Sequence, residues 1–103
     1  MTDFSQPIGH EQGFRRPAVV VSADGFNASG LDLAVVVPVT TRKRNWSMHV
    51  ELEPGESGLR DVSWAKVEDI KSVSTLRLVH QLGVVDPLVL DRIGAIARVL
   101  LDL

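Results

Sequence analysis

Two short valine-rich runs restrict the fold of this chain more than any other feature of its sequence. One reads RPAVVVSAD over residues 16–24, and the other reads DLAVVVPVT over residues 32–40. β-Branched residues favour strands, and the second run, which is apolar without alternation, indicates burial on both faces or a central position in the sheet. The intervening GFNASG at 25–30 is rich in turn-forming residues, so we expect a loop that joins two neighbouring strands.

Shorter strands are predicted through the middle of the chain. Residues 48–53 alternate between apolar and polar, which predicts a strand with His49, Glu51 and Glu53 on one face. His49 has no metal-ligand spacing to another histidine, so we expect it to be structural. A kink or a brief helical turn is expected at 68–69. The remaining short strands are expected at residues 3–4, 63–67, 70–73 and 76–81.

The last segment has the pattern of an amphipathic helix. Asp86 is a favourable N-cap residue, and Pro87 suits the first helical position. Helical spacing places five apolar side chains on one face: Leu90, Ile93, Ile96, Ala97 and Leu100. The order of elements therefore predicts an α+β fold, a small barrel of curved antiparallel strands with a C-terminal helix.

Composition limits the classes of protein to which this chain can belong. A length of 103 residues allows one compact domain, residues 1–103, and the absence of cysteine excludes a disulfide framework and a thiolate metal site. The longest apolar run, Leu33–Val39, has seven residues, whereas roughly 20 are needed to cross a bilayer. The N-terminus lacks the pattern of a signal peptide. We therefore expect a cytoplasmic protein with no membrane partner.

Charge is segregated along the sequence. The formal net charge is −2, from 11 Lys and Arg against 13 Asp and Glu, which as an average argues against a nucleic-acid partner. Residues 12–19 and 40–50 nevertheless hold five basic side chains and no acidic one: Arg15, Arg16, Arg42, Lys43 and Arg44. This pattern predicts a local groove for an anionic ligand on an otherwise acidic body.

Two segments combine a buried strand with polar side chains at its end. GHEQGFRRPAVVVS at 9–22 places Arg16 at the start of the first valine-rich strand, and VVVPVTTRKRNW at 35–46 places Thr40 at the end of the second. If the two strands pair, we expect Arg16 and Thr40 near one end of the sheet. Trp64 is expected to pack in the core or at a dimer interface.

These segments resemble the MazF/PemK toxins of bacterial toxin–antitoxin systems. The resemblance rests on Gly-His-Glu-Gln at 9–12 followed by Arg-Pro-Ala-Val-Val at 16–20, on Val-Pro-Val-Thr-Thr at 37–41, and on the stretch 63–73. It covers most of the chain. Each motif alone is weak, but three of them in the same order are specific.

The resemblance implies a small SH3-like barrel of the PemK–CcdB type and a homodimeric endoribonuclease toxin. Members of the family cleave single-stranded RNA, usually messenger RNA, at a short recognition sequence without a metal or another cofactor, and a MazE-like antitoxin holds them inactive. The 2′-hydroxyl attacks the adjacent phosphorus, which leaves a 2′,3′-cyclic phosphate and a 5′-hydroxyl. By position, the family's essential arginine and threonine correspond to Arg16 and Thr40.

The chemistry of these residue types fits that expectation. A guanidinium offers a planar fork of donors to the nonbridging oxygens of a phosphate and a threonine hydroxyl adds a neutral donor, so Arg16 and Thr40 are the expected catalytic residues. His10 and Glu11 are the titratable candidates for proton transfer. RNA contacts are expected from the basic, hydroxyl and aromatic side chains nearby: Arg15, Thr41, Arg42, Lys43, Arg44 and Trp46.

Two departures from the family pattern keep a second interpretation open. Glu68 and Asp69 stand where the family has an aspartate and a glutamine. By the resemblance, Met1 falls inside the family's N-terminal strand, so we expect either a start codon assigned too far downstream or a member with a shortened sheet. The alternative is a non-enzymatic binder on the same fold, either a catalytically weak or inactive antitoxin-binding homologue or a CcdB-like inhibitor of gyrase. The intact Arg16 and Thr40 favour the enzyme.

Overall fold

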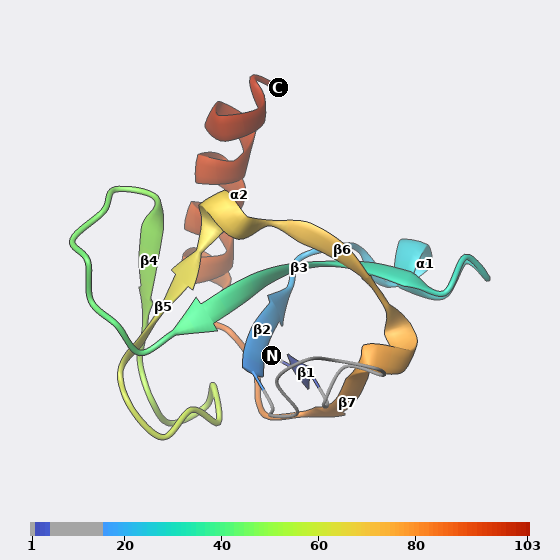
Figure 1. The fold of residues 1–103 in the computed structure, drawn as a ribbon, viewed down its shortest axis with the longest axis horizontal. Helices are drawn as coiled ribbons and strands as arrows, with labels where there is room; N and C mark the ends of the chain where they lie inside the picture. Colours follow the sequence, from blue (N-terminus) through green and yellow to red (C-terminus); the bar gives the residue numbers. More distant parts are fainter. Residues whose placement is uncertain (1, 5–15) are drawn as a thin grey trace.

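A computed structural model describes residues 2–4 and 16–103 of the protein. In these residues the chain forms one antiparallel sheet of seven strands and a C-terminal helix (Figure 1). The strands are β1 (Thr2–Phe4), β2 (Arg16–Val20), β3 (Leu33–Thr40), β4 (His49–Leu52), β5 (Ser63–Lys66), β6 (Lys71–Ser74) and β7 (Leu78–Gln81). The helices are α1 (Asp24–Asn27) and α2 (Pro87–Leu101), with 3-10 turns η1 (Val67–Asp69) and η2 (Thr75–Arg77). The predicted α+β class is confirmed.

Strand β3 is the centre of the sheet. It pairs with β2 along one edge, while β6 and then β5 share its other edge (Figure 1). The path through the sheet runs β4-β5-β3-β2-β1-β7, with β6 on β3. Among the described strands no pairing joins the two ends of this path, so closure into a barrel is not detected. The turn η1 separates β5 from β6, as the expected interruption at 68–69 predicts.

The loop expected at 25–30 is partly helical, which corrects that prediction. The Ser22 and Asn27 side chains hydrogen-bond each other, and Asn27 Nδ2 donates to the Ser22 carbonyl at 3.2 Å. Ser22 Oγ also accepts a hydrogen bond from the Val35 amide at 2.9 Å, which fixes α1 against β3. The contact with Val35 joins residues 13 apart in the sequence, so the turn-rich composition of the segment does not reveal the helix.

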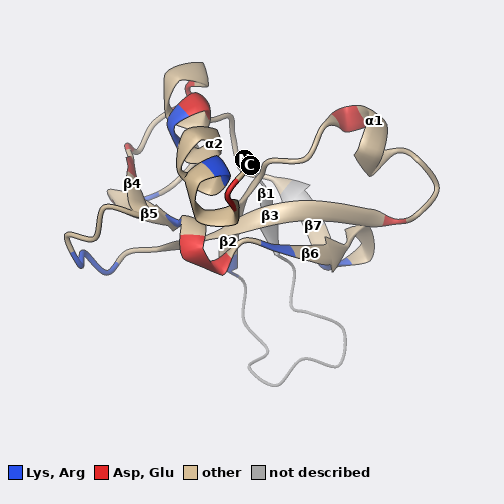
Figure 2. Ribbon diagram, turned by 90° about the horizontal axis from the view of Figure 1, so that it is seen from above, with Lys and Arg blue, Asp and Glu red and all other residues tan. Residues whose placement is uncertain are grey.

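The main core lies between the sheet and α2, which crosses one face of the sheet (Figure 2). Its buried side chains are Val19, Val37, Val39, Val50, Leu52, Leu59, Ala65, Val67 and Ile93. A second cluster of Ala18, Val36 and Val73 lies on the opposite face of β2 and β3, because neighbouring residues of a strand point to opposite faces. Strand β3 is therefore central in the sheet and covered on both faces, as predicted for residues 32–40.

Helix α2 begins where the sequence predicts. The Asp86 carboxylate accepts a hydrogen bond from the Leu88 amide at 2.8 Å, and Pro87 is the first helical residue. Of the predicted apolar face, Ile93 is buried and Ile96 and Ala97 pack against the core. Leu90 and Leu100 remain 40% and 41% exposed, so the buried stripe is narrower than expected. Within the described residues, neither helix combines the length and the apolar character that spanning a bilayer requires.

Replacing the capping residue Asp86 with alanine should lower the free energy of unfolding by about 1 kcal/mol, because the Leu88 amide loses the carboxylate to which it donates. Urea unfolding followed by circular dichroism measures the change. Asp91→Ala is the matched control, because Asp91 is an exposed acid inside the same helix. An equal loss in the control would show that charge, and not capping, is responsible.

Candidate functional site

Arg16 and Thr40 lie at the same end of the sheet. β2 and β3 are paired with Ala18 opposite Pro38 and Val19 opposite Val37. Continuing this antiparallel register by two residues places Arg16 opposite Thr40. Arg16 is exposed and Thr40 is half-buried. The expectation that the two residues meet at one end of the sheet is therefore confirmed by the register of the strands.

The row of opposed residues continues beyond Thr40. Thr40 is paired with Trp64 of β5, and Trp64 is paired with Glu51 of β4. Directly opposed residues of antiparallel strands present their side chains on the same face. The alternate residues of these strands, such as Val39, face the core beneath α2. Arg16, Thr40 and Trp64 therefore form a row, called the polar row below, on the face turned away from α2.

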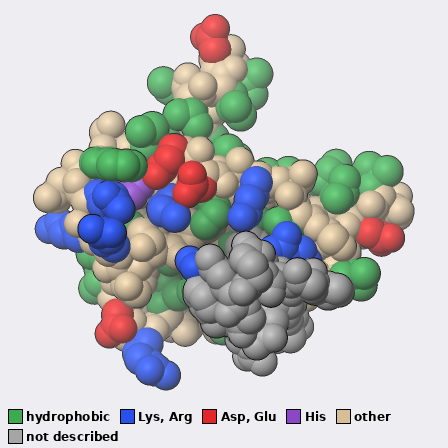
Figure 3. Space-filling view, viewed as in Figure 1, with side chains coloured by type: hydrophobic (Ala, Val, Ile, Leu, Met, Phe, Trp, Pro, Cys, Tyr) green, Lys and Arg blue, Asp and Glu red, His purple; other side chains and the backbone are tan. Residues whose placement is uncertain are grey.

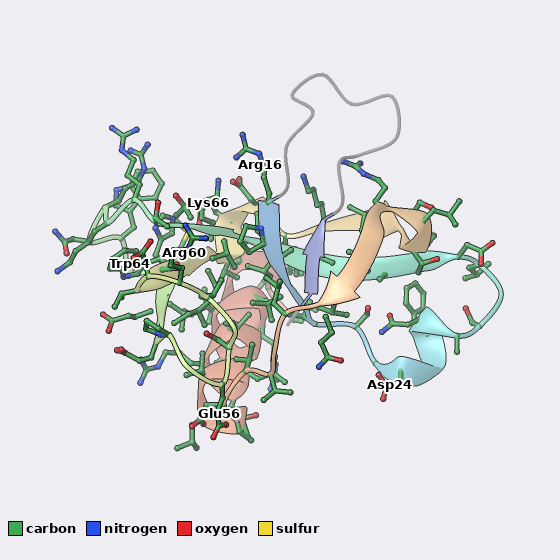
Figure 4. The ribbon with its side chains drawn as sticks, turned by 90° about the horizontal axis from the view of Figure 1, so that it is seen from below. Arg16, Asp24, Glu56, Arg60, Trp64 and Lys66 are labelled. Carbon is green, nitrogen blue, oxygen red and sulfur yellow. The ribbon has the colours of Figure 1, made fainter. Side chains whose placement is uncertain are left out.

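Trp64 is a member of this row that the sequence alone did not identify. Its side chain is half-buried and stands beside Thr40, on the opposite face from the main core. Only the pairing of β3 with β5 reveals this position. Figure 4 labels two members of the row, Arg16 at the start of β2 and Trp64 on β5, together with Lys66 of β5.

The segment after Thr40 forms an exposed basic loop, residues 41–47, at the end of β3 that is remote from α1 (Figures 1 and 2). All of its expected RNA contacts are exposed: Thr41, Arg42, Lys43, Arg44 and Trp46. The Arg42 amide donates to Thr40 Oγ1 at 3.1 Å. A hydroxyl that accepts in this way keeps its own hydrogen for another acceptor. Thr40 therefore has a donor available for a ligand at the polar row.

Beneath the basic loop lies a polar pair that joins two distant segments. His49 Nε2 lies 2.7 Å from Glu68 Oε2, and the His49 side chain is 1% exposed while that of Glu68 is 22% exposed. The expectation that His49 is structural is consistent with this burial. Glu68 is directed towards His49 from η1. No spacing in the sequence signals the pair, because the two residues lie on elements brought together only by the sheet.

Positive and negative groups adjoin on this side of the molecule. Lys and Arg side chains gather over the loop and strand ends, with acidic groups beside them (Figure 3). Lys66 Nζ lies 3.0 Å from Asp69 Oδ2. On β4 and just after it, a side-chain hydrogen bond with Glu51 and the charge of that residue raise the pKa of the Glu53 carboxyl above its usual value. The basic loop therefore borders an acidic edge, as the segregated charge predicts.

The other expected site residues, His10, Glu11 and Arg15, lie outside the described residues. Within the described part, no cluster of three or more His, Cys, Asp or Glu side chains is arranged to hold a metal ion. The chemical groups that the polar row and the basic loop offer are guanidinium, hydroxyl, ammonium and indole. Together they suit a ligand that carries phosphate charge and flat bases.

Comparisons with known proteins give a family match and two relatives of similar length. Residues 1–101 match the family described as PemK-like, MazF-like toxins of type II toxin–antitoxin systems. The chain is 34% identical to endoribonuclease MazF9 of Mycobacterium tuberculosis (strain ATCC 25618 / H37Rv) over 106 residues, covering 98% of this chain and 90% of that protein. It is 26% identical to endoribonuclease EndoA of Bacillus subtilis (strain 168) over 102 residues, covering 98% and 88%.

A solved structure has the same fold. The MazE–MazF complex of Deinococcus radiodurans in its second crystal form aligns with a TM-score of 0.78 at 27% identity, covering 97% of this chain and 89% of that chain. The similarity spans the strands that carry the polar row as well as α2, because nearly the whole chain is aligned.

Proposed function

The chain belongs to the family of PemK-like, MazF-like toxins of type II toxin–antitoxin systems, and from this premise we propose that it cleaves single-stranded RNA, above all messenger RNA, at the polar row. Its named relatives are endoribonucleases. The observation that carries the proposal is the register of β2 with β3, which sets Arg16 opposite Thr40. Thr40 is followed directly by the exposed basic loop.

The proposed reaction depends above all on stabilising the negative charge that develops on the phosphate oxygens in the transition state. The 2′-oxygen of a ribose loses its proton and attacks the adjacent phosphorus, and the bond from phosphorus to the 5′-oxygen breaks as that oxygen gains a proton. The products are a 2′,3′-cyclic phosphate and a 5′-hydroxyl. Negative charge builds on the nonbridging oxygens in between, and preorganised donors aimed at this charge contribute most to such catalysis.

Arg16 and Thr40 are the proposed donors. The Arg16 guanidinium matches two phosphate oxygens with a planar fork, and the Thr40 hydroxyl, oriented by the Arg42 amide, adds a neutral donor. Arginine holds its proton too tightly to act as an acid or a base. We therefore assign proton transfer to His10 and Glu11, the titratable residues of the segment that leads into β2.

RNA is proposed to follow the basic loop. Arg42, Lys43 and Arg44 neutralise phosphates, and Trp46, which is 46% exposed, stacks on an unpaired base. Arg15 and Thr41 extend the same surface. Trp64 stands in the polar row beside Thr40, where its ring limits how a nucleotide approaches the hydroxyl.

Removing the charge of the loop should weaken RNA binding in a salt-dependent way. In the triple variant Arg42→Gln, Lys43→Gln, Arg44→Gln, the slope of log Kd against log salt should fall by about 2, because each phosphate contact on single strands contributes roughly 0.7. Fluorescence anisotropy of a labelled RNA between low and high salt measures the slope. Arg92→Gln with Arg98→Gln on α2 is the control, and an equal fall there would contradict the assignment to the loop.

We also propose the partners that the family implies. A homodimer is the active form, and a MazE-like antitoxin inhibits it by placing an acidic segment over the basic loop. The Deinococcus radiodurans relative was solved together with its MazE. Residues 1–103 are proposed to act as a single domain in both assemblies.

Cleavage of a long RNA in the presence of a metal chelator tests the proposed function. We expect cleavage at defined positions, with 5′-hydroxyl and 2′,3′-cyclic phosphate ends on the products. RNA that stays intact in chelator and in magnesium alike would overturn the ribonuclease and favour the alternative, an antitoxin-binding homologue without activity. Inhibition of gyrase by that same protein would instead favour a CcdB-like toxin.

A further inference from the structure

The basic loop is connected to the body of the protein by a series of four side chains. The Arg44 guanidinium lies 5.2 Å from the centroid of the Trp46 ring, and the Trp46 ring lies 5.1 Å from the His49 ring at an angle of 47°. His49 Nε2 then lies 2.7 Å from Glu68 Oε2. The series therefore runs from the exposed loop to η1, which lies beside the start of β4, where His49 is paired with Lys66.

The side chain of His49, between Trp46 and Glu68, is more deeply buried than either of them. Trp46 is 46% exposed, whereas the His49 side chain is 1% exposed. The main chain follows the same path, because the His49 amide donates to the Trp46 carbonyl at 3.0 Å. Trp46 is thus in contact with His49 through both its ring and its carbonyl. The loop itself, residues 41–47, has no helix or strand of its own.

The buried pair is poorly explained as core packing. His49 Nδ1 and Glu68 Oε1 are both buried and have no hydrogen-bond partner among the described residues. A buried polar atom without a partner lowers stability, and apolar side chains of similar size would avoid that loss. What the pair provides instead is a fixed orientation of the His49 ring. The hydrogen bond from Nε2 to the Glu68 carboxylate restricts rotation of the imidazole, and the Trp46 ring packs against that imidazole.

We propose that His49 and Glu68 are positioning residues for RNA: their buried hydrogen bond holds the Trp46 ring, and with it Arg44, in the arrangement that receives the substrate. The proposal rests on the ribonuclease function proposed above. A loop that is already ordered loses less conformational entropy when RNA binds, so it binds more tightly. His49 and Glu68 themselves touch neither RNA nor the reacting atoms.

Kinetics separate positioning from catalysis. In His49→Ala and in Glu68→Ala we expect KM for RNA to rise about tenfold while kcat stays within about twofold, because the loss falls on binding and not on the polar row. The Kd for an uncleavable RNA, 2′-O-methylated at a mapped cleavage position, should rise by the same factor. His49→Gln, whose amide can still donate to Glu68, should recover most of the affinity.

A double variant and a neighbouring acid provide the controls. Because the two residues act through one bond, His49→Ala with Glu68→Ala should lose no more affinity than about the larger single loss. Asp69→Asn on the same turn removes the partner of Lys66, at a side chain that is 50% exposed, and should leave the affinity unchanged.

Fluorescence tests the contact without RNA. In a Trp64→Phe background, Trp46 is the only tryptophan, so acrylamide quenching and anisotropy report on its ring alone. We expect quenching to rise about twofold and anisotropy to fall in His49→Ala and in Glu68→Ala, as the ring becomes freer, and neither to change in Asp69→Asn. Thermal unfolding of each variant confirms that it is folded.

The outcomes distinguish this proposal from the proposed function. Higher quenching and lower anisotropy of Trp46, together with weaker RNA binding, support the positioning role. The positioning role is overturned if quenching and anisotropy change in His49→Ala and Glu68→Ala but the affinity for RNA does not. It is also overturned if the fluorescence is unchanged in both variants. In either case the proposed RNA cleavage by the parent protein is unaffected. If the parent neither binds nor cleaves RNA, the ribonuclease function fails, and the positioning role fails with it.

Discussion

Replacing Arg16 with alanine is expected to lower kcat/KM for RNA cleavage by about 10³-fold, equivalent to about 4 kcal/mol of transition-state stabilisation. Arg16 is exposed at the first position of β2, opposite Thr40. Its guanidinium is the strongest donor in the polar row, and its removal leaves the charge on the phosphate oxygens to a neutral hydroxyl. The free energy of unfolding should change by less than about 0.5 kcal/mol, since exposed side chains contribute little to stability.

Cleavage of a short RNA that contains one mapped position, followed under single-turnover conditions, measures the loss. Arg16→Lys keeps the charge without the planar fork and should fall between the parent protein and the alanine variant. Arg98→Ala, an exposed arginine on α2, is the matched control and should cleave at the parental rate. An Arg16→Ala protein that retains a tenth or more of the activity would remove Arg16 from the catalytic role.

Replacing Thr40 with valine is expected to lower kcat by about 10²-fold, with little change in KM, because valine keeps the shape and loses the hydroxyl. The hydroxyl is oriented by the Arg42 amide, which donates to it at 3.1 Å. Loss of this acceptor should also lower the free energy of unfolding by about 1 kcal/mol. Rate constants at saturating RNA, together with urea unfolding, measure both effects.

Two further variants make the Thr40 result specific. Thr40→Ser keeps the hydroxyl and should retain activity within about tenfold of the parent protein. Thr75→Val makes the same chemical change in η2, away from the polar row, and should leave the rate unaltered. If the serine variant is as slow as the valine variant, the methyl group of Thr40 matters more than its hydroxyl.

The parts of this site that the sequence predicts depend on residue type and on neighbouring positions in the chain. Arg16 and Thr40 each stand at one end of a valine-rich run, so pairing of the two runs was enough to bring them together. The basic loop follows Thr40 directly in the chain. The start of α2 was equally predictable, because the Asp86 cap and Pro87 act within one turn of each other.

The parts that the sequence does not predict depend on long-range pairing. Trp64 joins the polar row only through the register of β3 with β5. His49 looked like the polar side of an alternating strand, yet its side chain is 1% exposed because Glu68 and Trp46 cover it. The short helix α1 exists through contacts of Ser22 with Asn27 and with β3. Such contacts leave no periodic signal in the sequence.

A sulfur substitution at the scissile phosphate tests most directly whether Arg16 contacts a nonbridging oxygen. Sulfur accepts hydrogen bonds weakly, so the parent protein should cleave the two phosphorothioate diastereomers at rates that differ by about tenfold or more. In Arg16→Ala this preference should change, because the Thr40 hydroxyl is then the remaining donor of the polar row at the two oxygens. A preference that persists unchanged in Arg16→Ala would contradict the placement of the Arg16 guanidinium at the reacting phosphate.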